Sequence, residues 1–197
     1  MDRISFKPGN MLYPLPAVMV SCEKPGEKAN IVTVAWTGTV CSDPAMVYIS
    51  LRPERHSHSI IKSTGEFVIN LINKELVHSM DYCGVKSGRD VDKFQQCRLT
   101  RAASQTVAAP SIAQSPVCIE CKVTKVIPLG SHDMFLANVT AVTVDGKYMD
   151  DKGRFHLNSC GLVAYSHGEY FCLGAKQGSF GYSVKKNRPA GRQKHRK

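Results

Sequence analysis

The stretch NIVTVAWTGTVCSDPAMVYISLRPERHSHSIIKSTGEFVINL, residues 30–71, decides the fold class of this chain. β-Branched and apolar runs alternate in it with breaks at Gly38 and Arg52-Pro53, which is the pattern of short strands. The polar segment 56–63 departs from this pattern, and its Ile60-Ile61 pair indicates a short helix that packs against a core. We predict strands over 30–36, 46–51 and 66–71, and a helix over 56–63.

The flanking sequence continues this alternation of short strands and turns. A clear turn, Lys24-Pro25-Gly26-Glu27, follows an apolar run, and two long alternating segments meet at Gly130-Ser131. The predicted segments are a strand over 17–22, a helix over 75–82, a polar loop over 86–93, a connection over 102–116, and strands over 117–129 and 133–144. Six strands and two helices predict a mainly β fold, a β-barrel with short helical insertions.

Length and composition predict one globular domain. The chain has 197 residues, of which 43% are hydrophobic and 21% charged, so it can bury a core without disulfides or metals. No repeat or linker divides it, and we expect a single domain over residues 1–184. No apolar run reaches the ~20 residues that cross a bilayer, which excludes a transmembrane protein. Asp2, Arg3 and Lys7 have no apolar run behind them, so we expect no secretory signal and a cytoplasmic location.

The positive charge of the chain is concentrated at its C-terminal end. The formal net charge is +10, and seven positive charges lie in residues 185–197, which leaves +3 for the rest. Such a basic tail contacts RNA, membranes or acidic partners in some proteins and is simply a solvated terminus in others. No aromatic residue interleaves with these charges, so we expect a solvated tail and no nucleic-acid partner.

The eight cysteines do not predict a disulfide framework or a metal site. The chain is neither short nor dense in cysteine. Cys118 and Cys121 have a C-x-x-C spacing but lie in a predicted strand, where side chains three residues apart point to opposite faces. We therefore predict reduced thiols packed as small hydrophobes. Cys41 follows the W-T-G-T turn, and the sequence leaves open whether it is redox-active or only packed.

Several motifs of nucleotide-binding and hydrolytic enzymes are absent from the sequence. There is no G-x-x-x-x-G-K-[ST], G-x-S-x-G or H-E-x-x-H, and the glycines at 174, 178 and 181 do not fit G-x-G-x-x-G. Any nicotinamide chemistry must therefore work without a Rossmann site.

Four polar clusters lie at the ends of predicted strands, where the mouth of a barrel would collect them. The clusters are Asn30 with Trp36-Thr37-Gly38-Thr39, residues 52–59, residues 86–93 and residues 130–133. They supply cations, hydroxyl groups, helix amides and an aromatic plane. A flavin mononucleotide needs all of these, because its phosphate is nearly a dianion and its ring is flat. Ser57, near a helix start and close to Arg52 or Arg55, is suited to the phosphate.

Three segments together resemble the flavin reductase-like, FMN-binding split-barrel family, and its flavoredoxin-type branch most closely. They are residues 30–71, CGVKSGRDVDKF at 83–94, and LGSHDMFLANV at 129–139. The resemblance spans about residues 10–175. It implies a split β-barrel and a homodimer with FMN near the subunit interface.

The resemblance also implies roles for individual residues. Asn30, Trp36 and Thr37, with Gly38 beside them, would line the flavin ring and ribityl chain. Ser57 would hold the phosphate, at a position where family members often have Thr. The other implied contacts are Lys93 from the polar loop, His132 at the pocket edge and Tyr165 beside the ring. To these we add Arg52 and Lys86, because a dianion needs compensating charge.

Simpler interpretations of the same residues stay open. Trp36 could belong to the core, His132 to a solvated turn, and Lys93 to the surface. His56, His58 and His78 are expected on helix faces rather than on a metal.

The resemblance favours an FMN-dependent oxidoreductase that takes electrons from NADH or NADPH and passes them to a small molecule or a redox protein. An alternative is a flavoredoxin-like electron carrier that a partner protein reduces. A third hypothesis, from another class, is a nucleic-acid- or anion-binding barrel that uses the basic tail. The expected cofactors are therefore FMN and a reduced nicotinamide, with no metal.

Overall fold

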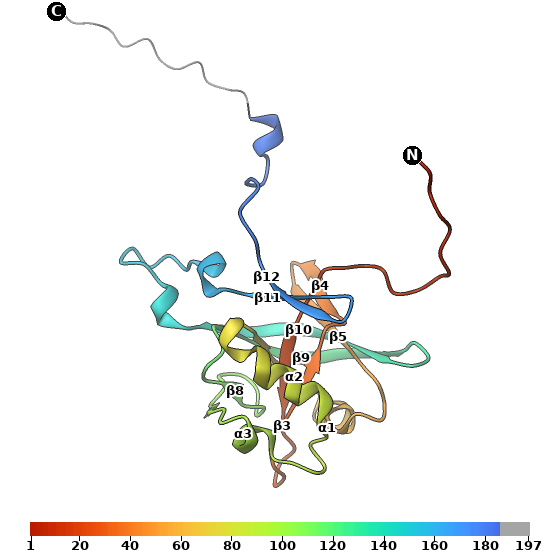
Figure 1. The fold of residues 1–197 in the computed structure, drawn as a ribbon. Coiled ribbons are helices and arrows are strands. Elements are labelled where there is room, and N and C mark those ends of the chain that lie inside the picture. Colours follow the sequence, from red (N-terminus) through yellow and green to blue (C-terminus); the bar gives the residue numbers. More distant parts are fainter. Residues whose placement is uncertain (186–197) are drawn as a thin grey trace, which may run out of the picture.

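The computed structural model describes residues 1–185 and contains one seven-stranded antiparallel sheet. Its strands are β2 (Val18–Cys22), β3 (Asn30–Val34), β4 (Thr37–Ser42), β5 (Ala45–Leu51), β6 (Glu66–Leu71), β9 (Val117–Pro128) and β10 (Asp133–Val144). Their order is β3-β2-β6-β9-β10-β5-β4, and Figure 1 labels β3, β4, β5, β9 and β10 among them. The end strands β3 and β4 are joined by only two residues, so the sheet must curl round to bring its ends together. The mainly β, split-barrel prediction is confirmed.

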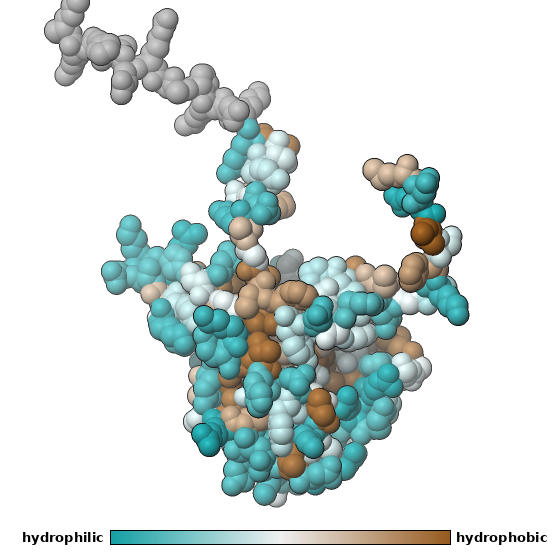
Figure 2. Space-filling view, viewed as in Figure 1, coloured by the Kyte–Doolittle hydropathy of each residue, from teal (hydrophilic) through white to brown (hydrophobic). Residues whose placement is uncertain are grey.

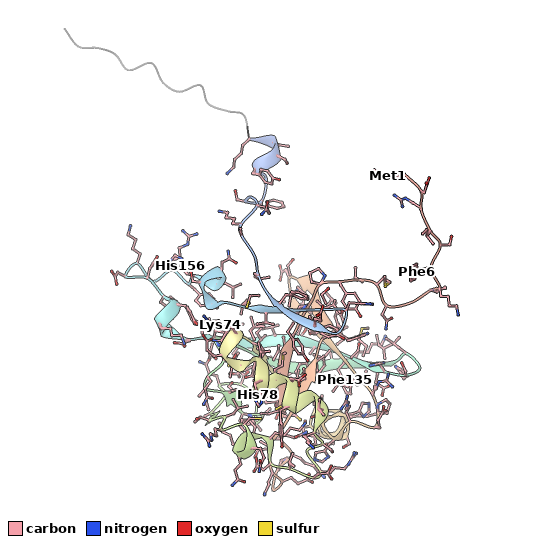
Figure 3. All side chains as sticks on the ribbon, viewed as in Figure 1. Met1, Phe6, Lys74, His78, Phe135 and His156 are labelled. Carbon is pink, nitrogen blue, oxygen red and sulfur yellow. The ribbon has the colours of Figure 1, made fainter. Side chains whose placement is uncertain are left out.

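The interior of the barrel is filled from both the strands and one helix. Residues Val18 and Val20 of β2 point inward, as does Phe135 of β10, which Figure 3 labels. Helix α1 (His56–Thr64) adds Ile60 and Ile61, which are buried as its sequence pattern predicts. Because strand side chains alternate, Met19, which lies between Val18 and Val20, faces the other side of the sheet.

A second apolar core lies on the outer face of β2 and β3. Met19 and Ile31 pack there against Met80 of α2 (Val77–Val85) and Phe94 of α3 (Lys93–Gln96). Figure 1 shows α1, α2 and α3 gathered around the β2–β3 end of the sheet. Strand β2 is therefore buried on both faces, which explains why its sequence is apolar except for Ser21.

The remaining elements are short. A three-stranded sheet combines β1 (Leu15–Pro16) with the hairpin of β11 (Val163–Ser166) and β12 (Glu169–Cys172). The others are β7 (Arg101–Ala102), β8 (Ser111–Ile112) and the 3₁₀ helices η1 (Lys74–Leu76), η2 (Gly146–Tyr148), η3 (Leu157–Cys160) and η4 (Tyr182–Val184). Residues 1–12 and 173–180 are exposed throughout, and both terminal segments leave the body (Figures 1 and 3).

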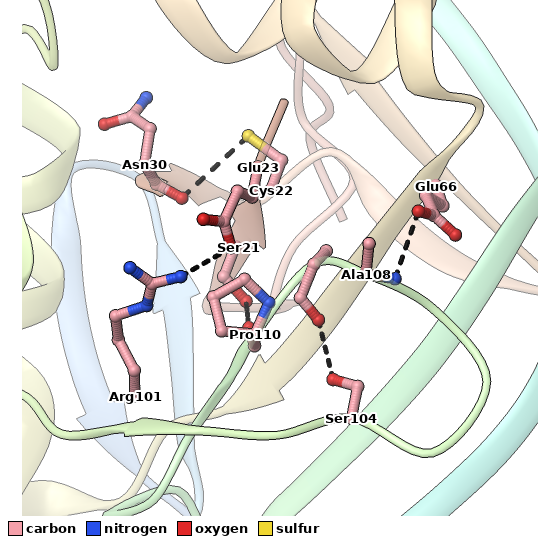
Figure 4. Close-up of polar contacts among 10 residues, drawn as sticks. Ser21, Cys22, Glu23, Asn30, Glu66, Arg101, Ser104, Ala108 and Pro110 are labelled. Atoms are coloured by element: carbon pink, nitrogen blue, oxygen red, sulfur yellow. Dashed lines mark hydrogen bonds and ion pairs between the residues drawn. The ribbon is translucent and has the colours of Figure 1, made fainter. Parts of the chain in front are cut away.

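Polar contacts anchor the connection that follows α3. Arg101 pairs with Glu23 at 2.6 Å, and the Ser21 hydroxyl donates to the carbonyl of Pro110 at 2.5 Å. The amide of Ala108 donates to the Glu66 carboxylate at 3.1 Å (Figure 4). These contacts hold a segment of weak periodicity against β2 and β6.

The structure corrects several details of the predicted elements. Gly38 is not a break but lies inside β4, because extended backbone continues from Thr37 to Ser42. Six strands were an undercount, since β4 and five strands of two or four residues carry too little pattern to detect. The predicted connection over 102–116 contains most of the β7–β8 pair, and a short helix follows the polar loop.

The strand around Cys118 and Cys121 is confirmed, and its two thiols lie in different apolar clusters. No helix among residues 1–185 is long and apolar enough to cross a bilayer. The predicted basic tail, residues 185–197, lies outside the described residues except for Lys185.

Candidate functional site

Two adjoining clefts open where the curled sheet meets α1, α2 and the loop after α2. Their volumes are about 510 Å³ and 520 Å³, and both are lined by Val32, Arg52, Arg55 and Val85. The cation cleft is also lined by Asn30, Ser57, Lys86, Gly88, Arg89 and Lys93. The aromatic cleft is also lined by Trp36, Asp81, His132, Tyr165 and Tyr170. Because the clefts share a wall, one elongated molecule can occupy both.

A buried amide–hydroxyl pair forms the floor of the cation cleft. Asn30, the first residue of β3, donates from Nδ2 to the hydroxyl of Ser57 at 2.8 Å. The exposed fractions of these residues are only 4% and 1%. Gly88 lies directly against the Asn30 amide, and a Cβ at this position would clash with it. The loop after α2 therefore needs a glycine to close this side of the cleft.

The cation cleft carries a strong excess of positive charge. Its cations are Arg52, Arg55, Lys86, Arg89 and Lys93, and its one acidic residue is Glu54. Glu54 lies 3.6 Å from Arg52, and its backbone carbonyl accepts from Arg89. The first turn of α1 adds its free amides at the same place. The arrangement suits a phosphate-like anion.

Lys93 is the most constrained of these cations. Its ammonium donates to the carbonyl of Ile31 at 2.6 Å and to that of Cys83 at 2.8 Å, and the residue is 3% exposed. Burial lowers the pKa of Lys93 from its ordinary value. Two of the three ammonium protons are used inside the protein, which leaves one for the cleft. Lys93 is therefore not a surface charge.

The aromatic cleft is built around a parallel pair of rings. Trp36 and His132 stack with centroids 6.2 Å apart and planes 8° apart, and Tyr165 lies 6.3 Å from Trp36. Burial lowers the pKa of His132, and the charge of Arg52 lowers it further. Its imidazole is therefore neutral at pH 7. The Ser131 hydroxyl contacts its Nδ1 at 2.9 Å.

The β11–β12 hairpin closes the far side of the aromatic cleft. Tyr165 of β11 and Tyr170 of β12 are paired across the hairpin, and their ring centroids are 5.9 Å apart. The Tyr170 hydroxyl donates to Asp81 of α2 at 2.8 Å. Burial and this carboxylate raise the pKa of Tyr170 to about 12, so the phenol stays protonated and keeps the hairpin tied to α2.

A buried pair of side chains, His58 and Asp133, connects the two segments that carry the clefts. His58 Nε2 lies 2.9 Å from a carboxylate oxygen of Asp133, and both residues are buried. His58 follows Ser57 in α1, and Asp133 follows His132 in the β9–β10 turn. The pair therefore links the element that carries the cation cleft to the turn that carries the aromatic cleft.

The structure brings together eight of the ten predicted site residues. Asn30, Arg52, Ser57, Lys86 and Lys93 line the cation cleft, and Arg52 also borders the aromatic cleft with Trp36, His132 and Tyr165. Thr37 and Gly38 line neither cleft. The Thr37 hydroxyl donates to the carbonyl of Tyr48 at 2.6 Å, and Gly38 packs against the Tyr48 ring. Cys41 also lines neither, and its thiol faces the carbonyl of Asp43.

Arg55, Arg89 and Tyr170 are among the lining residues outside the ten candidates, although the sequence analysis considered Arg55 beside Ser57 as an alternative to Arg52. Arg55 and Arg89 belong to the polar clusters that the sequence shows, but nothing in those runs tells which cation faces inward. Tyr170 lies in the hairpin at the C-terminal end of the domain, and its four-residue strand gave no signal.

Comparisons with known proteins show the family and the fold of this chain. The family model of the flavin reductase like domain matches residues 10–171. An uncharacterized protein of Archaeoglobus fulgidus is 30% identical over 141 residues, which cover 72% of this chain and 78% of that protein. The flavoredoxin of Desulfovibrio vulgaris (Miyazaki F) has a TM-score of 0.86 at 28% identity, covering 93% of this chain and 100% of that one. The FMN-binding protein from Thermus thermophilus shares the fold, with a TM-score of 0.75 at 24% identity, covering 91% and 98%.

The chain belongs to the flavin reductase like domain family, which groups flavin-binding oxidoreductases. The residues present fit a flavin. The cation cleft supplies the positive charge and the buried hydroxyl that a phosphate needs, and the aromatic cleft supplies flat neighbours for a ring.

Proposed function

We propose that the protein binds one FMN across the two clefts and acts as an NAD(P)H-dependent oxidoreductase. The phosphate would lie in the cation cleft against Ser57, Lys93 and the first turn of α1. The ring would lie in the aromatic cleft beside Trp36, His132 and Tyr165. One observation carries this proposal: a cation-rich cleft and an aromatic cleft share a wall formed by Arg52, Arg55 and two valines.

The protein's own contribution would be positioning and electrostatics. Bound FMN supplies the hydride- and electron-transfer chemistry. Arg52 borders both clefts, and its positive charge would stabilise negative charge on a ring held in the aromatic cleft. Neutral His132, stacked on Trp36, presents an aromatic plane without adding charge. No side chain needs to act as a general acid or base in this scheme.

The test is the absorption spectrum of the purified protein, repeated after NADH and then NADPH are added under argon. We expect a yellow protein, loaded with FMN if necessary, that either nicotinamide bleaches within seconds. A protein that stays colourless with added FMN would refute the proposal.

A second candidate function is that of an electron carrier, which a partner protein reduces. The similarity to a flavoredoxin at 28% identity over 93% of this chain favours it. Slow bleaching by both nicotinamides, together with fast reduction by a redox protein, would select this function. In either case the electron acceptor is a small molecule or a redox protein.

We further propose that the protein is a homodimer with FMN near the subunit interface. The N-terminal arm exposes Ile4, Phe6 and Leu12, and the C-terminal segment exposes Phe180 and Val184. Figure 2 shows apolar side chains on both extended segments. Asn10 of this arm borders the aromatic cleft, so an interface here would adjoin the site. Light scattering of the full chain should give twice the mass of one chain, and deletion of residues 1–9 should give monomers.

The cytoplasm is the compartment that we propose for this protein. All eight cysteines are free thiols, which a reducing compartment preserves. Fractionation of cells that express the protein from its own promoter tests this.

A further inference from the structure

Two cysteines lie next to each other at the base of the loop that carries the cations. Cys83 is in the last turn of α2, and Cys97 caps the C-terminal end of α3. Their sulfur atoms are 4.0 Å apart. Neither is a lining residue of the two clefts, and the proposed function uses neither.

We propose that Cys83 and Cys97 form a reversible disulfide that locks the loop between α2 and α3. The fourteen-residue separation of the two cysteines encloses Lys86, Gly88, Arg89 and Lys93 of the cation cleft. A disulfide requires the sulfurs to approach to about 2.05 Å, so they must move together by about 2 Å. Cys83 lies in the last turn of α2, which leads into this loop, and Cys97 directly follows the four-residue helix α3, so the shift moves one end of each helix.

The two thiols differ in their access to an oxidant. Cys97 is partly exposed and lines an open cavity of about 610 Å³ that shares no lining residue with either cleft. Cys83 is buried beneath it. An oxidant from solvent therefore reaches Cys97 first, and Cys83 lies in place as the resolving thiol.

Hydrogen peroxide is the oxidant that we name for this reaction. The Cys97 thiolate attacks one peroxide oxygen, which forms a sulfenic acid and releases hydroxide. Cys83 then loses its proton, its thiolate attacks the sulfenic sulfur, the S–S bond forms, and the oxygen leaves as hydroxide. The two hydroxide ions combine with the two protons that the thiols lose. In total, two thiols and one hydrogen peroxide give one disulfide and two waters.

Burial makes this oxidation slow at neutral pH. It raises the pKa of Cys83 to about 12 and also raises that of Cys97. Only the thiolate reacts, so the rate should rise roughly tenfold per pH unit between pH 7 and 9. The pair is thus expected to respond to sustained oxidation rather than to brief exposure.

Lys93 couples the cysteine pair to the cation cleft. The Lys93 ammonium donates to the backbone carbonyl of Cys83 at 2.8 Å, and the backbone amide of Cys97 donates to the backbone carbonyl of Lys93 at 3.1 Å. A bond between the sulfurs would hold both of these partners of Lys93. We therefore expect the oxidised loop to open less often. On the proposed function, FMN would also leave more slowly.

The experiment is peroxide treatment of the purified protein at pH 8.5, followed by alkylation, digestion and non-reducing mass spectrometry. The expected product joins the tryptic peptides 75–86 and 94–98, with the loss of two hydrogens, and dithiothreitol reverses it. The variant Cys97→Ser should lose this product. Cys172→Ser, which removes the exposed cysteine, should keep it. The proposal is overturned if peroxide oxidises the other cysteines while Cys83 and Cys97 can both still be alkylated. It is also overturned if peroxide overoxidises Cys97 and no disulfide forms.

A second measurement tests the link to the loop without any flavin. Trypsin should cut native, oxidised protein after Lys86 and Arg89 at least threefold more slowly than reduced protein, and Cys83→Ser should abolish the difference. Equal rates would refute the locking. If the disulfide forms and the loop is protected but FMN never binds, only the proposed function fails.

Discussion

The cation cleft and the aromatic cleft are built on different principles. The cation cleft is held by buried polar contacts: Asn30 to Ser57 at its floor, and Lys93 to two backbone carbonyls at its side. The aromatic cleft is held by ring contacts and by exposed hydrogen bonds, from Tyr170 to Asp81 and between Ser131 and His132. Buried polar contacts fix positions strictly, because an unpaired group is costly, whereas ring contacts tolerate adjustment.

This difference assigns the clefts separate tasks. The strictly positioned cation cleft should determine whether and how tightly a flavin binds. The more adaptable aromatic cleft should determine the surroundings of its ring and the approach of a second molecule. Substitutions in the first should therefore change affinity and stability, and substitutions in the second should change spectra and reactivity.

The largest effect is expected from Lys93→Met. The substitution leaves the carbonyls of Ile31 and Cys83 buried without a donor, which should cost about 2 kcal/mol of unfolding free energy. The Tm should fall by roughly 6 °C. Loss of the charge should also weaken FMN binding roughly 10–100-fold. Calorimetry measures both quantities.

Lys86→Met is the matched control, because it removes an exposed lysine from the same cleft. It should weaken FMN binding by less and leave the Tm unchanged. An equal fall in Tm for both variants would contradict the structural role of Lys93.

Gly88→Ala should be the next most damaging change. The new Cβ would displace the Asn30 amide, and with it the donor that fixes the Ser57 hydroxyl. Overpacking of this kind costs about 1–3 kcal/mol, so FMN affinity should fall about tenfold or more. Gly146→Ala, where a Cβ meets nothing within 4 Å, should bind FMN normally.

His132→Asn should change the aromatic cleft with little effect on affinity, less than about threefold in Kd. Trp36 is the single tryptophan, and His132 stacks on it. Because burial and Arg52 lower the pKa of His132, the imidazole gains its proton only when the pH falls below 6.5. Protonation should quench the fluorescence of Trp36 in the flavin-free protein with a midpoint below 6.5. The variant should show no such transition, and a transition that persists would refute the assignment.

Tyr170→Phe should have the smallest effect. It removes the hydrogen bond to Asp81, which is exposed, so the loss should be about 0.5–1 kcal/mol. FMN affinity should not change. Tyr82→Phe, on the same helix as Asp81, serves as the control, and thermal melts of the two variants measure the difference.

The cation cleft could be predicted from the sequence because its signals are local. Ser57 lies at a helix start, and Lys86 and Lys93 lie at the two ends of one polar loop, so chemistry and position could be read together. The inward cations could not be separated from the outward ones. Arg55 donates to the carbonyl of Gly84 and Arg89 to that of Glu54, and both are tertiary contacts that the sequence does not show.

The aromatic cleft was less accessible to sequence reasoning. Trp36 and His132 are 96 positions apart and meet only through the curl of the sheet. The fold class was predictable from the alternation in residues 30–71, but β4 was not, since Gly38 and polar side chains interrupt it. Thr37 and Gly38, implied by the resemblance, contact Tyr48 rather than a cleft, and their role at a flavin stays a prediction.

The most direct test of the central claim, that the two clefts hold one flavin together, is a paired titration. FMN and riboflavin are added separately to the flavin-free protein, and the fluorescence of Trp36 is followed. We predict that FMN binds once per chain and quenches Trp36. Riboflavin, which lacks the phosphate, should reach the same final quenching at roughly 100-fold higher Kd. Equal affinities for the two flavins, or FMN binding that leaves Trp36 fluorescence unchanged, would contradict the account.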